Sequence, residues 1–526
     1  MATEAAERHT VPALIARWAV QQPDARFLVA DDETLTYGAF EDATRNAAAR
    51  FSAHGVVKGT RVGVMIPNST AWAVAALAVA RIGGVVVTLS TLLRPPELEV
   101  QLRTAAVEHL VVVPEFRGRR YLDDLRAISP ALVPQPHAIF DRTLPRLRSI
   151  ISWPEWSTTT TEPRAEPSLV DALERAVRPA DDLAIIFTSG SRGAPKGVIH
   201  THGGALGATE AGLDARCMTP DDRLYVAMPL FWVGGLGTGL LSVLLAGATL
   251  VIEAQPEPAR TLALLARERV TLFRGWPDQA EAVAAHPDFT STDLSSLRPG
   301  SLQAVLPEPA PPGTRASLLG MTESFGPYSG ARLDRDLPAG KENSCGRPFA
   351  DVEVRVVDPG TGARVEPGVV GELQIRSRNM MRAICGRVRA DVFTADGFYP
   401  TGDLGEIDDD GYLFFRGRRD DMFKVKGASV YPSEVEAVLT ELPGVDRAFV
   451  VDVDRESVAT VGAVVVLAPN AECSVEDLTA GARAKLSAFK VPTCWRVIGA
   501  DDVPMTPTGK VDQPALRRLL DVGAFA

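Results

Sequence analysis

A glycine-rich segment with two cationic side chains is the part of the sequence best suited to chemistry. It reads Phe187-Thr188-Ser189-Gly190-Ser191-Arg192-Gly193-Ala194-Pro195-Lys196-Gly197 and overlaps the end of an apolar run, Leu183–Phe187. Glycines and hydroxyl residues let a backbone wrap closely around an anion, and Arg192 and Lys196 add positive charge. The segment is not a Walker P-loop, because Pro195 stands where that motif has glycine and because Val198-Ile199 favours a strand. We interpret residues 187–197 as a phosphate-binding loop, with an ordinary Gly/Ser turn as the alternative.

Seven further motifs follow in order along the chain. They are Pro229-Leu230-Phe231 with Gly234-Gly235; Gly320-Met321-Thr322-Glu323; Gly346-Arg347-Pro348; Gly371-Glu372-Leu373; Tyr399-Pro400-Thr401-Gly402-Asp403; Gly417-Arg418-Arg419-Asp420 through Lys424 and Gly427; and Pro504-Met505-Thr506-Pro507-Thr508-Gly509-Lys510. Each motif is weak by itself. Together with the phosphate loop, in this order and over nearly the whole chain, they resemble the adenylate-forming enzymes, the superfamily of acyl-CoA synthetases, nonribosomal-peptide adenylation domains and firefly luciferases.

The resemblance implies an ATP-dependent acid ligase. In that reaction a small-molecule carboxylic acid attacks the α-phosphorus of MgATP, pyrophosphate leaves, and CoA captures the acyl-adenylate. Charge builds on phosphate oxygens in the first step, so preorganised cations and backbone dipoles are the expected catalysts. Alternatives are an amide-forming or carrier-protein-loading ligase, with an amine or a carrier protein acting in trans as acceptor, and a nitrite-activating relative. A catalytically silent binding module on the same fold is a further alternative, against which the presence of Glu323 and Lys510 argues.

The resemblance also assigns roles to individual residues. The residues that would hold the phosphates are Thr188, Ser189, Gly190, Ser191, Arg192, Gly193 and Lys196, and Glu323 with Thr188 and Thr322 would hold Mg²⁺. Asp403, helped by Arg418, would bind the ribose, and Lys510 would contact the reacting carboxylate and the α-phosphate. The second half-reaction would use Lys424 and Gly427, and the substrate pocket would contain Trp232, Gly234, Leu319 and Gly320. Mg²⁺ prefers oxygen ligands, and a lysine is a compact point charge suited to a reacting phosphate. The plain alternatives are a surface acid for Glu323, a turn residue for Asp403 and a loose tail lysine for Lys510. We interpret His202, just after the loop, as structural.

The sequence departs from the family pattern at four places. Arg192 stands where the phosphate loop usually has threonine, Trp232 where many acyl-CoA ligases have histidine, and Leu319 where an aromatic residue normally covers adenine. The stretch Pro299–Leu319 is shorter than in relatives and rich in proline. An indole at position 232 would enlarge the apolar wall of the pocket. We therefore expect a rebuilt pocket that admits a bulkier or flatter acid, or an unusual acceptor.

Length and composition exclude several classes. At 526 residues the chain exceeds one compact core, so at least two domains are expected. Its 66 acidic and 55 basic residues give a net charge of −11, which disfavours general nucleic-acid binding. Five scattered cysteines without a CxxC pair indicate reduced thiols rather than a zinc site. The first ten residues lack the apolar run of a secretion signal, so we expect a cytoplasmic protein, and we leave a homodimer open.

The spacing of apolar runs predicts an α/β protein. Expected strands are Val62–Ile66, Leu110–Val113, Leu183–Phe187, Leu250–Ile252 and Val352–Val357, and expected helical stretches include Leu240–Ala246 and Thr261–Arg269. The apolar segment Ala71–Ser90 is near the length of a membrane span. Arg81 and Gly83-Gly84 interrupt it, so a buried helix, a turn and a buried strand fit better. A loop is predicted from Trp153 to Ser168, where prolines flank a run of hydroxyl residues.

The amino-acid composition changes near residue 411, where the sequence becomes rich in arginine and aspartate. A helix is predicted at Pro432–Leu442, followed by strands at Ala448–Val453 and Val461–Leu467. We place a boundary near Asp420. Residues 1–419 would form a large domain of parallel-rich sheets with helices and, by resemblance, a distorted barrel-like subdomain. Residues 420–526 would form a small α+β domain that rotates about a hinge at Asp420 between the two half-reactions.

Overall fold

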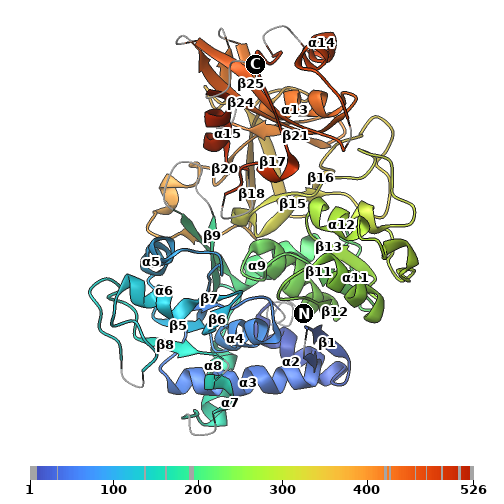
Figure 1. Ribbon diagram of the computed structural model, residues 1–526. Coiled ribbons are helices and arrows are strands. Elements are labelled where there is room, and N and C mark those ends of the chain that lie inside the picture. The colour runs from blue at the N-terminus through green and yellow to red at the C-terminus, as the bar shows by residue number, and fades with distance from the viewer. Residues whose placement is uncertain are drawn as a thin grey trace. The chain divides into compact units, whose positions relative to one another are not determined.

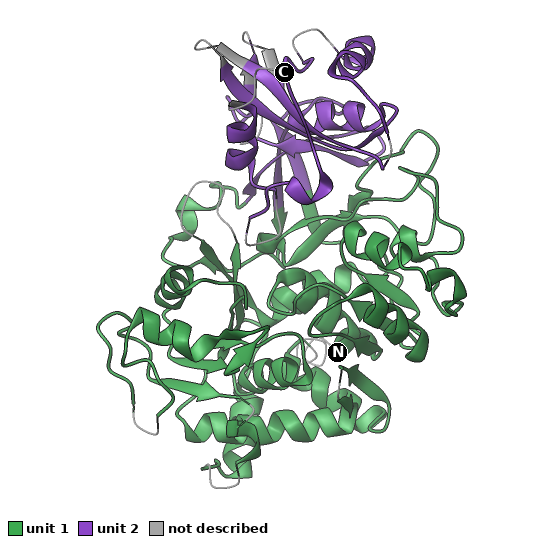
Figure 2. Ribbon diagram, viewed as in Figure 1, with its two compact units in different colours: residues 1–353, 376–397 green, residues 354–375, 398–526 purple. Residues whose placement is uncertain are grey.

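The chain forms two compact units. The computed structural model describes residues 9–31, 33–135, 138–153, 155–159, 163–188, 195–419, 423–425, 428–455, 458–469, 471–486, 490–506 and 511–521. Unit 1 contains residues 1–353 and 376–397, and unit 2 contains residues 354–375 and 398–526 (Figure 2). Each unit is described by itself.

The largest sheet of unit 1 has seven strands in the order β19-β10-β9-β4-β3-β5-β8. Figure 1 labels β9, β5 and β8 of this sheet. They are β3 (Arg61–Met65), β4 (Val85–Thr88), β5 (His109–Val112), β8 (Ser149–Ser152), β9 (Asp182–Thr188), β10 (Lys196–Thr201) and β19 (Ala383–Ile384). Strands β9, β4, β3, β5 and β8 are parallel, whereas β10 pairs antiparallel with β9 and with β19. Alternate residues enter two different cores, Val86 on one face and Val87 on the other. Because both faces are covered, these strands appear in the sequence as unbroken apolar runs.

Helices cover both faces of this sheet. One face packs against α2 (Val11–Gln21), α3 (Tyr37–Ala53), α4 (Thr70–Arg81) and α8 (Pro167–Ala176), and the other against α5 (Pro95–Thr104) and α6 (Tyr121–Ile128). Every residue of α4 except the partly buried Ala71 is buried, and the hydroxyl of Ser69 caps the start of the helix by accepting a hydrogen bond from Trp72 N at 3.2 Å. Arg81, at the end of α4, forms an ion pair with Glu174 at 3.0 Å. The predicted buried helix and strand within Ala71–Ser90 are confirmed. Within the described ranges, no helix is long and apolar enough to cross a membrane.

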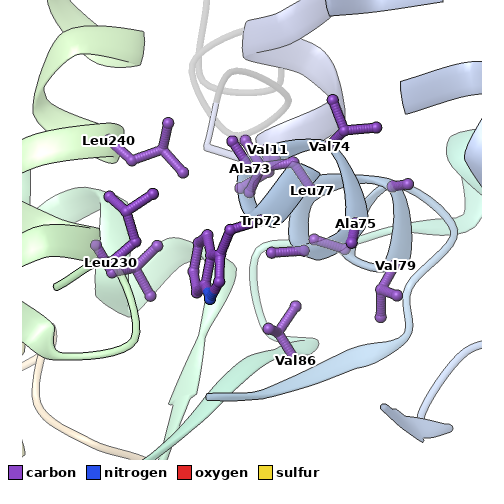
Figure 3. Packing of buried hydrophobic residues seen from close by; sticks show 14 of the residues in the cluster. Val11, Trp72, Ala73, Val74, Ala75, Leu77, Val79, Val86, Leu230 and Leu240 are labelled. Atoms are coloured by element: carbon purple, nitrogen blue, oxygen red, sulfur yellow. The ribbon is translucent and has the colours of Figure 1, made fainter. Parts of the chain in front are cut away.

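A second sheet of unit 1 shares a core with the first. Its order is β13-β11-β12-β1-β2, with β1 (Arg26–Val29), β2 (Thr34–Thr36), β11 (Arg223–Val226), β12 (Thr249–Val251) and β13 (Leu272–Arg274). One face joins the core of α4, together with α9 (His202–Ala211), the π-helix η1 (Gly234–Leu241) and α10 (Ser242–Ala246). The other face packs against α11 (Pro258–Arg267) and α12 (Pro277–Ala284). Figure 3 shows Trp72 of α4 beside Leu230, with Leu240 of η1 in the same apolar cluster.

Shorter elements complete unit 1. They are β6 (Glu115–Phe116), β7 (Arg119–Arg120), α7 (Glu155–Thr158), β14 (Leu319–Met321), β15 (Gly326–Gly330), β16 (Arg347–Pro348) and the 3₁₀ turns η2 (Phe289–Ser291), η3 (Gln303–Val305), η4 (Thr322–Ser324) and η5 (Arg389–Asp391). The loop predicted from Trp153 to Ser168 is wrong in two places, because α7 lies within it and α8 begins at Pro167. Trp156 explains α7: its ring is buried against Phe51, with centroids 4.8 Å apart. This packing overrides the loop-like local composition.

Unit 2 contains antiparallel and mixed sheets. The first has the order β17-β18-β20-β21, with β17 (Val352–Val357), β18 (Gly371–Ser377), β20 (Tyr399–Ile407) and β21 (Leu413–Arg418), and β17 and β18 each extend into unit 1. The others are β22 (Phe423–Val425) with β23 (Ala428–Val430), and β24 (Val445–Arg455), β25 (Val458–Leu467) and β26 (Cys494–Ile498). Helices α13 (Pro432–Thr440) and α14 (Val475–Lys485) cover one face of the last sheet, and α15 (Gln513–Asp521) covers the other; the 3₁₀ turn η6 (Ala500–Asp502) follows β26.

The predicted α/β class with parallel-rich sheets is confirmed, as are the helix near Pro432 and the two strands after it. The sheet β17-β18-β20-β21, which precedes residue 420, groups by compactness with the C-terminal residues. A hinge concerns movement rather than compactness, so the boundary near Asp420 stays a prediction. Asp420 itself lies outside the described residues.

Candidate active site

Two residues of the predicted phosphate loop lie at the open end of a strand pair. Thr188 ends β9 and Lys196 begins β10, and the two residues are directly opposite each other in the antiparallel register. Both are partly exposed. Opposed residues in such a pair have side chains about 5 Å apart, so a hydroxyl and an ammonium group stand at the mouth of the loop. The remaining loop residues Ser189, Gly190, Ser191, Arg192 and Gly193 lie outside the described residues.

Glu323 sits in a rigid turn of unit 1. It belongs to η4, is 6% exposed, and its carbonyl accepts a hydrogen bond from Met381 N at 2.9 Å. The turn ends at Phe325, whose φ of 55° is left-handed. The hydroxyl of Ser324 donates to the carbonyl of Gly326 at 2.7 Å. These contacts fix the main chain before and after Glu323. A metal ligand needs such a fixed main chain to hold its side chain in place.

His200 connects this turn to the strand that carries Lys196. Its Nε2 lies 2.8 Å from the carbonyl oxygen of Thr322, and because a carbonyl only accepts, Nε2 carries the proton. The ring packs edge-on against Phe325, with centroids 4.9 Å apart. Burial lowers the pKa of His200 to about 4, so the imidazole is neutral at pH 7. The sequence analysis missed His200; its one signal was a polar residue inside the apolar strand Val198–His200.

His202 has a different environment. It begins α9, is fully buried, and its Nδ1 accepts a hydrogen bond from Val11 N at 3.2 Å. Burial lowers its pKa to about 4. These contacts join α9 to the start of α2, which agrees with the structural role expected for His202.

The Pro229–Gly235 turn is held by a side chain from outside it. The amide oxygen of Asn68 accepts from Leu230 N at 2.7 Å, and its amide nitrogen donates to the carbonyl of Met228 at 3.2 Å. A Cβ at Gly235 would lie 2.1 Å from the carbonyl oxygen of Pro229, so the turn requires glycine there. Asn68 is a second residue that the sequence analysis missed.

Three aromatic rings lie side by side after this turn. Trp232 packs edge-on against Phe231, with centroids 5.4 Å apart, and against Trp276, with centroids 5.6 Å apart. Trp276 precedes α12 and is 42% exposed. The predicted pocket residue Trp232 therefore belongs to an aromatic wall in which Trp276 takes part. Gly234 follows at the start of η1, where a Cβ would lie 2.5 Å from Met228 Sδ.

Leu319 and Gly320 begin the short strand β14. A Cβ at Gly320 would lie 2.4 Å from the carbonyl oxygen of Gly326, so its glycine permits close backbone pairing with β15. Leu319 is half-buried. The stretch Pro299–Leu319 crosses the end of β13, where Leu302 N donates to the carbonyl of Phe273 at 3.1 Å. It contains the 3₁₀ turn η3 and a proline-rich segment.

Asp403 and Arg418 form an ion pair within unit 2. They lie opposite each other on β20 and β21, with Arg418 Nη1 2.6 Å from Asp403 Oδ1. Arg418 also donates to the carbonyl of Thr401 at 3.1 Å, and Asp403 is 5% exposed. Gly402, which precedes Asp403, has a φ of 73°, and a Cβ there would approach the Arg418 guanidinium to 3.1 Å. The two side chains predicted to serve the ribose are therefore in direct contact.

The remaining predicted residues are described only in part. Asp420, Gly427 and Lys510 lie outside the described residues, and of Lys424 the structure describes the main chain in β22. Among the described residues, no cluster of three histidine, cysteine or acidic side chains could enclose a metal. Mg²⁺ suits a single protein carboxylate such as Glu323, because it retains waters and binds substrate phosphates.

Comparison with known proteins identifies the family. The profile of the AMP-binding enzymes matches residues 15–384, and that of the AMP-binding enzyme C-terminal domain matches residues 434–510. The chain is similar to a 3-[(3aS,4S,7aS)-7a-methyl-1,5-dioxo-octahydro-1H-inden-4-yl]propanoyl:CoA ligase of Mycobacterium tuberculosis, at 33% identity over 97% of this chain and 99% of the relative. It is also similar to a feruloyl-CoA synthase of an Amycolatopsis species, at 32% identity over 95% of this chain and 97% of the relative.

Solved structures share the fold. The anthranilate CoA ligase AuaEII in complex with anthranoyl-AMP superposes with a TM-score of 0.80 at 24% identity, over 97% of each chain. The O-succinylbenzoate CoA synthetase of Bacillus subtilis with ATP and magnesium superposes with a TM-score of 0.77 at 24% identity, over 97% of this chain and 99% of that one. The chain thus belongs to the AMP-binding enzymes, the adenylate-forming superfamily, and is a ligase of the AMP-forming acyl-CoA synthetase type.

Proposed function

We propose that this ligase activates a carboxylic acid with a bulky cyclic or aromatic group and transfers the acyl group to CoA. The observation that carries the activation step is the link through His200. One strand holds both Lys196, at the phosphate loop, and His200, which binds the turn of Glu323. Triphosphate and Mg²⁺ ligands are thereby held by one rigid element, as charge stabilisation requires.

The residues divide the work as follows. Thr188 and Lys196 bind and orient the triphosphate, and Glu323 holds Mg²⁺, which when bound neutralises phosphate charge. Asp403, positioned by Arg418, accepts hydrogen bonds from the ribose hydroxyls. Lys510 contacts the substrate carboxylate and the α-phosphate while the acyl-adenylate forms. A rotation about Asp420 then brings Lys424 and Gly427 to the second half-reaction.

Two observations support the acid class. The Trp232–Trp276 pair offers a broad apolar wall, and large rings bury much area against such a wall. The similar proteins include ligases named for a bicyclic propanoate, for ferulate and, in an Aromatoleum species, for 3-hydroxybenzoate. These relatives are all CoA ligases, which supports CoA as the acceptor.

The test is pyrophosphate release with a panel of short-chain, medium-chain, aromatic and bicyclic acids. Each productive acid is then supplied with CoA, with a simple amine, or with hydroxylamine, which traps any acyl-adenylate. We expect ring-containing acids to be preferred and a CoA thioester to form. Hydroxamate without thioester would contradict CoA as acceptor, and amide from the added amine would establish the amide-ligase alternative. Pyrophosphate release with nitrite alone would overturn the acid class.

A further inference from the structure

Two arginines lie buried next to each other in unit 1, outside the residues used above. Arg216 is 2% exposed and Arg274 is 7% exposed. Arg274, the last residue of β13, donates from Nη2 to the carbonyl oxygen of Arg216 at 2.5 Å. Arg216 donates from Nη2 to the carbonyl of Thr209 in α9. The two positive groups therefore share one buried location.

Neither guanidinium has a counter-ion among the described residues. The nearby carboxylates of Asp222 and Asp334 are each 2.7 Å from another arginine, Arg298 and Arg332. The Nε atoms of Arg216 and Arg274 are both buried without a hydrogen-bond partner in the described part of the chain. A buried charge without a partner destabilises the folded state.

Burial lowers the pKa of both guanidinium groups. Burial lowers the pKa of Arg216 to about 9 and that of Arg274 to about 10, and for Arg216 the charge of Arg274 adds to the effect. Both remain cations at pH 7. The hydrogen bond from Arg216 Nη2 to the end of α9 gives one donor of Arg216 a structural role. It explains neither the unpartnered Nε of Arg216 nor the burial of two like charges side by side.

The pair lies where ligands of α/β sheets bind. Arg274 stands at the carboxyl end of β13, in a row of parallel strands with β11 and β12. Leu272, two residues earlier, faces the core that contains η1, and Arg274 shares that side by strand alternation. Trp276 follows two residues later and contacts Trp232.

We propose that Arg216 and Arg274 bind an oxyanion of the carboxylate class, carried either by the far end of the acid substrate or by a free anion. The first source rests on the proposed function, since it requires an acid with a second acidic group beyond the Trp232–Trp276 wall. Two parallel, charge-assisted contacts would satisfy the orphaned Nε donors and restore local neutrality.

The first experiment measures thermal stability and needs no turnover. Acetate, inorganic phosphate, heptanedioate and 3-(3-carboxyphenyl)propanoate are added to the full-length wild type, R216M, R274M and R274K at constant ionic strength set with NaCl. We expect at least one of these oxyanions to raise the wild-type Tm by about 2 °C or more, with little change in R216M or R274M and a partial response in R274K.

The matched control is R298M, a neighbouring arginine that already has its counter-ion. Removing Arg298 leaves the buried Asp222 without its ion-pair partner, although Thr219 and Thr271 still donate hydrogen bonds to it, so this variant should melt at a lower temperature yet keep the anion response. Without added anion, R274M should melt no lower than wild type, because it loses an unpaired buried charge. Equal loss of the response in R298M and R274M, or no response of the wild type to any of the four anions, would overturn the free-anion source.

The second experiment identifies the substrate source. Pyrophosphate exchange is compared for heptanedioate against heptanoate and for 3-(3-carboxyphenyl)propanoate against 3-phenylpropanoate. If the acid carries the oxyanion, wild type should prefer one diacid by roughly 10- to 100-fold, and R274M should lose that preference while still using the monoacid. The anion site would be overturned if every variant exchanged pyrophosphate with monoacids while wild type showed neither a preference for a diacid nor a change in Tm with added anions. The proposed ligase function would be unaffected by that result. Absence of exchange with every acid would instead contradict the proposed function, and the thermal experiment would still decide on the site.

Discussion

His200 donates its Nε2 proton to the carbonyl of Thr322 across a sequence separation of 122 residues, at 2.8 Å. One side chain therefore joins the strand that begins at Lys196 to the turn that carries Glu323. In the proposed function this contact sets the spacing between the triphosphate residues and the Mg²⁺ ligand. His200 would then be a positioning residue, since it would touch neither substrate nor metal.

Removing that donor should weaken Mg²⁺ use. In H200L we expect pyrophosphate exchange to fall roughly 10-fold or more and the Mg²⁺ concentration for half-maximal rate to rise by a similar factor, because the Thr322–Glu323 turn loses its anchor. H200Q should restore most of the loss, since its amide nitrogen can donate from a similar place. H202L is the control, because it removes a buried histidine bonded to Val11 and should lower Tm without changing the Mg²⁺ requirement. A normal Mg²⁺ requirement in H200L would contradict the positioning role.

Stability should fall as the solution is acidified from pH 6.5 towards pH 4. Burial lowers the pKa of His109, His200 and His202 to about 4, below the ordinary 6.5. Between pH 6.5 and pH 4 these histidines bind protons in the unfolded chain but stay neutral in the folded chain. The free energy of unfolding therefore decreases on acidification through this interval. Urea unfolding at several pH values should give a shallower pH dependence for H200L and for H202L, by about 1.4 kcal/mol per pH unit each. Slopes identical to wild type would show that these rings are not held neutral.

Lys510 should act on the first half-reaction. K510A should reduce ATP–pyrophosphate exchange by on the order of 10²–10³-fold, the usual cost of deleting one electrostatic stabiliser, while ATP binding measured by equilibrium dialysis stays within a few-fold. K485A is the matched control, because it removes a lysine of unit 2 whose ion-pair partner is Glu441. If the rate of ATP–pyrophosphate exchange in K510A stayed within a few-fold of the wild-type rate, Lys510 would have no role in the first half-reaction.

Stiffening the predicted hinge should separate the two half-reactions. D420P should keep pyrophosphate exchange and lose thioester formation, because proline fixes φ in a segment that must rotate. D409P is the control: Asp409 is the second residue of a turn closed by Gly411 N and the Asp408 carbonyl at 2.9 Å, a position that accepts proline. Equal loss of both steps, or of neither, in D420P would count against the hinge.

The aromatic wall should select for ring-containing acids. W276A removes the ring that packs against Trp232, so the KM for a large cyclic or aromatic acid should rise about 10-fold, with less effect for a short-chain acid. F140A removes another exposed aromatic ring, 82% exposed, and should leave both KM values unchanged. A uniform change in KM for all acids would contradict a role in selectivity.

Local patterns predicted most of the regular structure, and contacts between distant segments account for what they missed. The strand β4 and the helix α4 follow from apolar runs bounded by Gly83-Gly84. The motif residues Thr188 with Lys196, and Asp403 with Arg418, do lie opposite each other on paired strands. The helix expected at Leu240–Ala246 is split between a π-helix and α10, because the close approach of Gly235 to Pro229 sets the start of η1.

The positions of His200 and of the Arg216–Arg274 pair could not be predicted in this way. A histidine in an apolar strand indicates a buried polar group but not its partner, and Thr322 is far away in the sequence. Arg274 is 58 residues from Arg216, and it ends β13, which pairs with the strand β11 that follows Arg216. Burial of a charge becomes visible once the neighbours on all sides are known.

The pairing of β1 with β12 has a consequence for biosynthesis. Leu28 and Val29 lie beside Leu250 and Val251 in parallel register, so β1, which pairs with the neighbouring β2 on one edge, gains its partner on the other edge only after about half the chain has left the ribosome. Until then α2, α3 and β1 expose the apolar surfaces that later enter the core shared with β11 and β12. The nascent chain is therefore expected to depend on a chaperone that shields this surface, and fragments ending before β12 should aggregate when expressed alone.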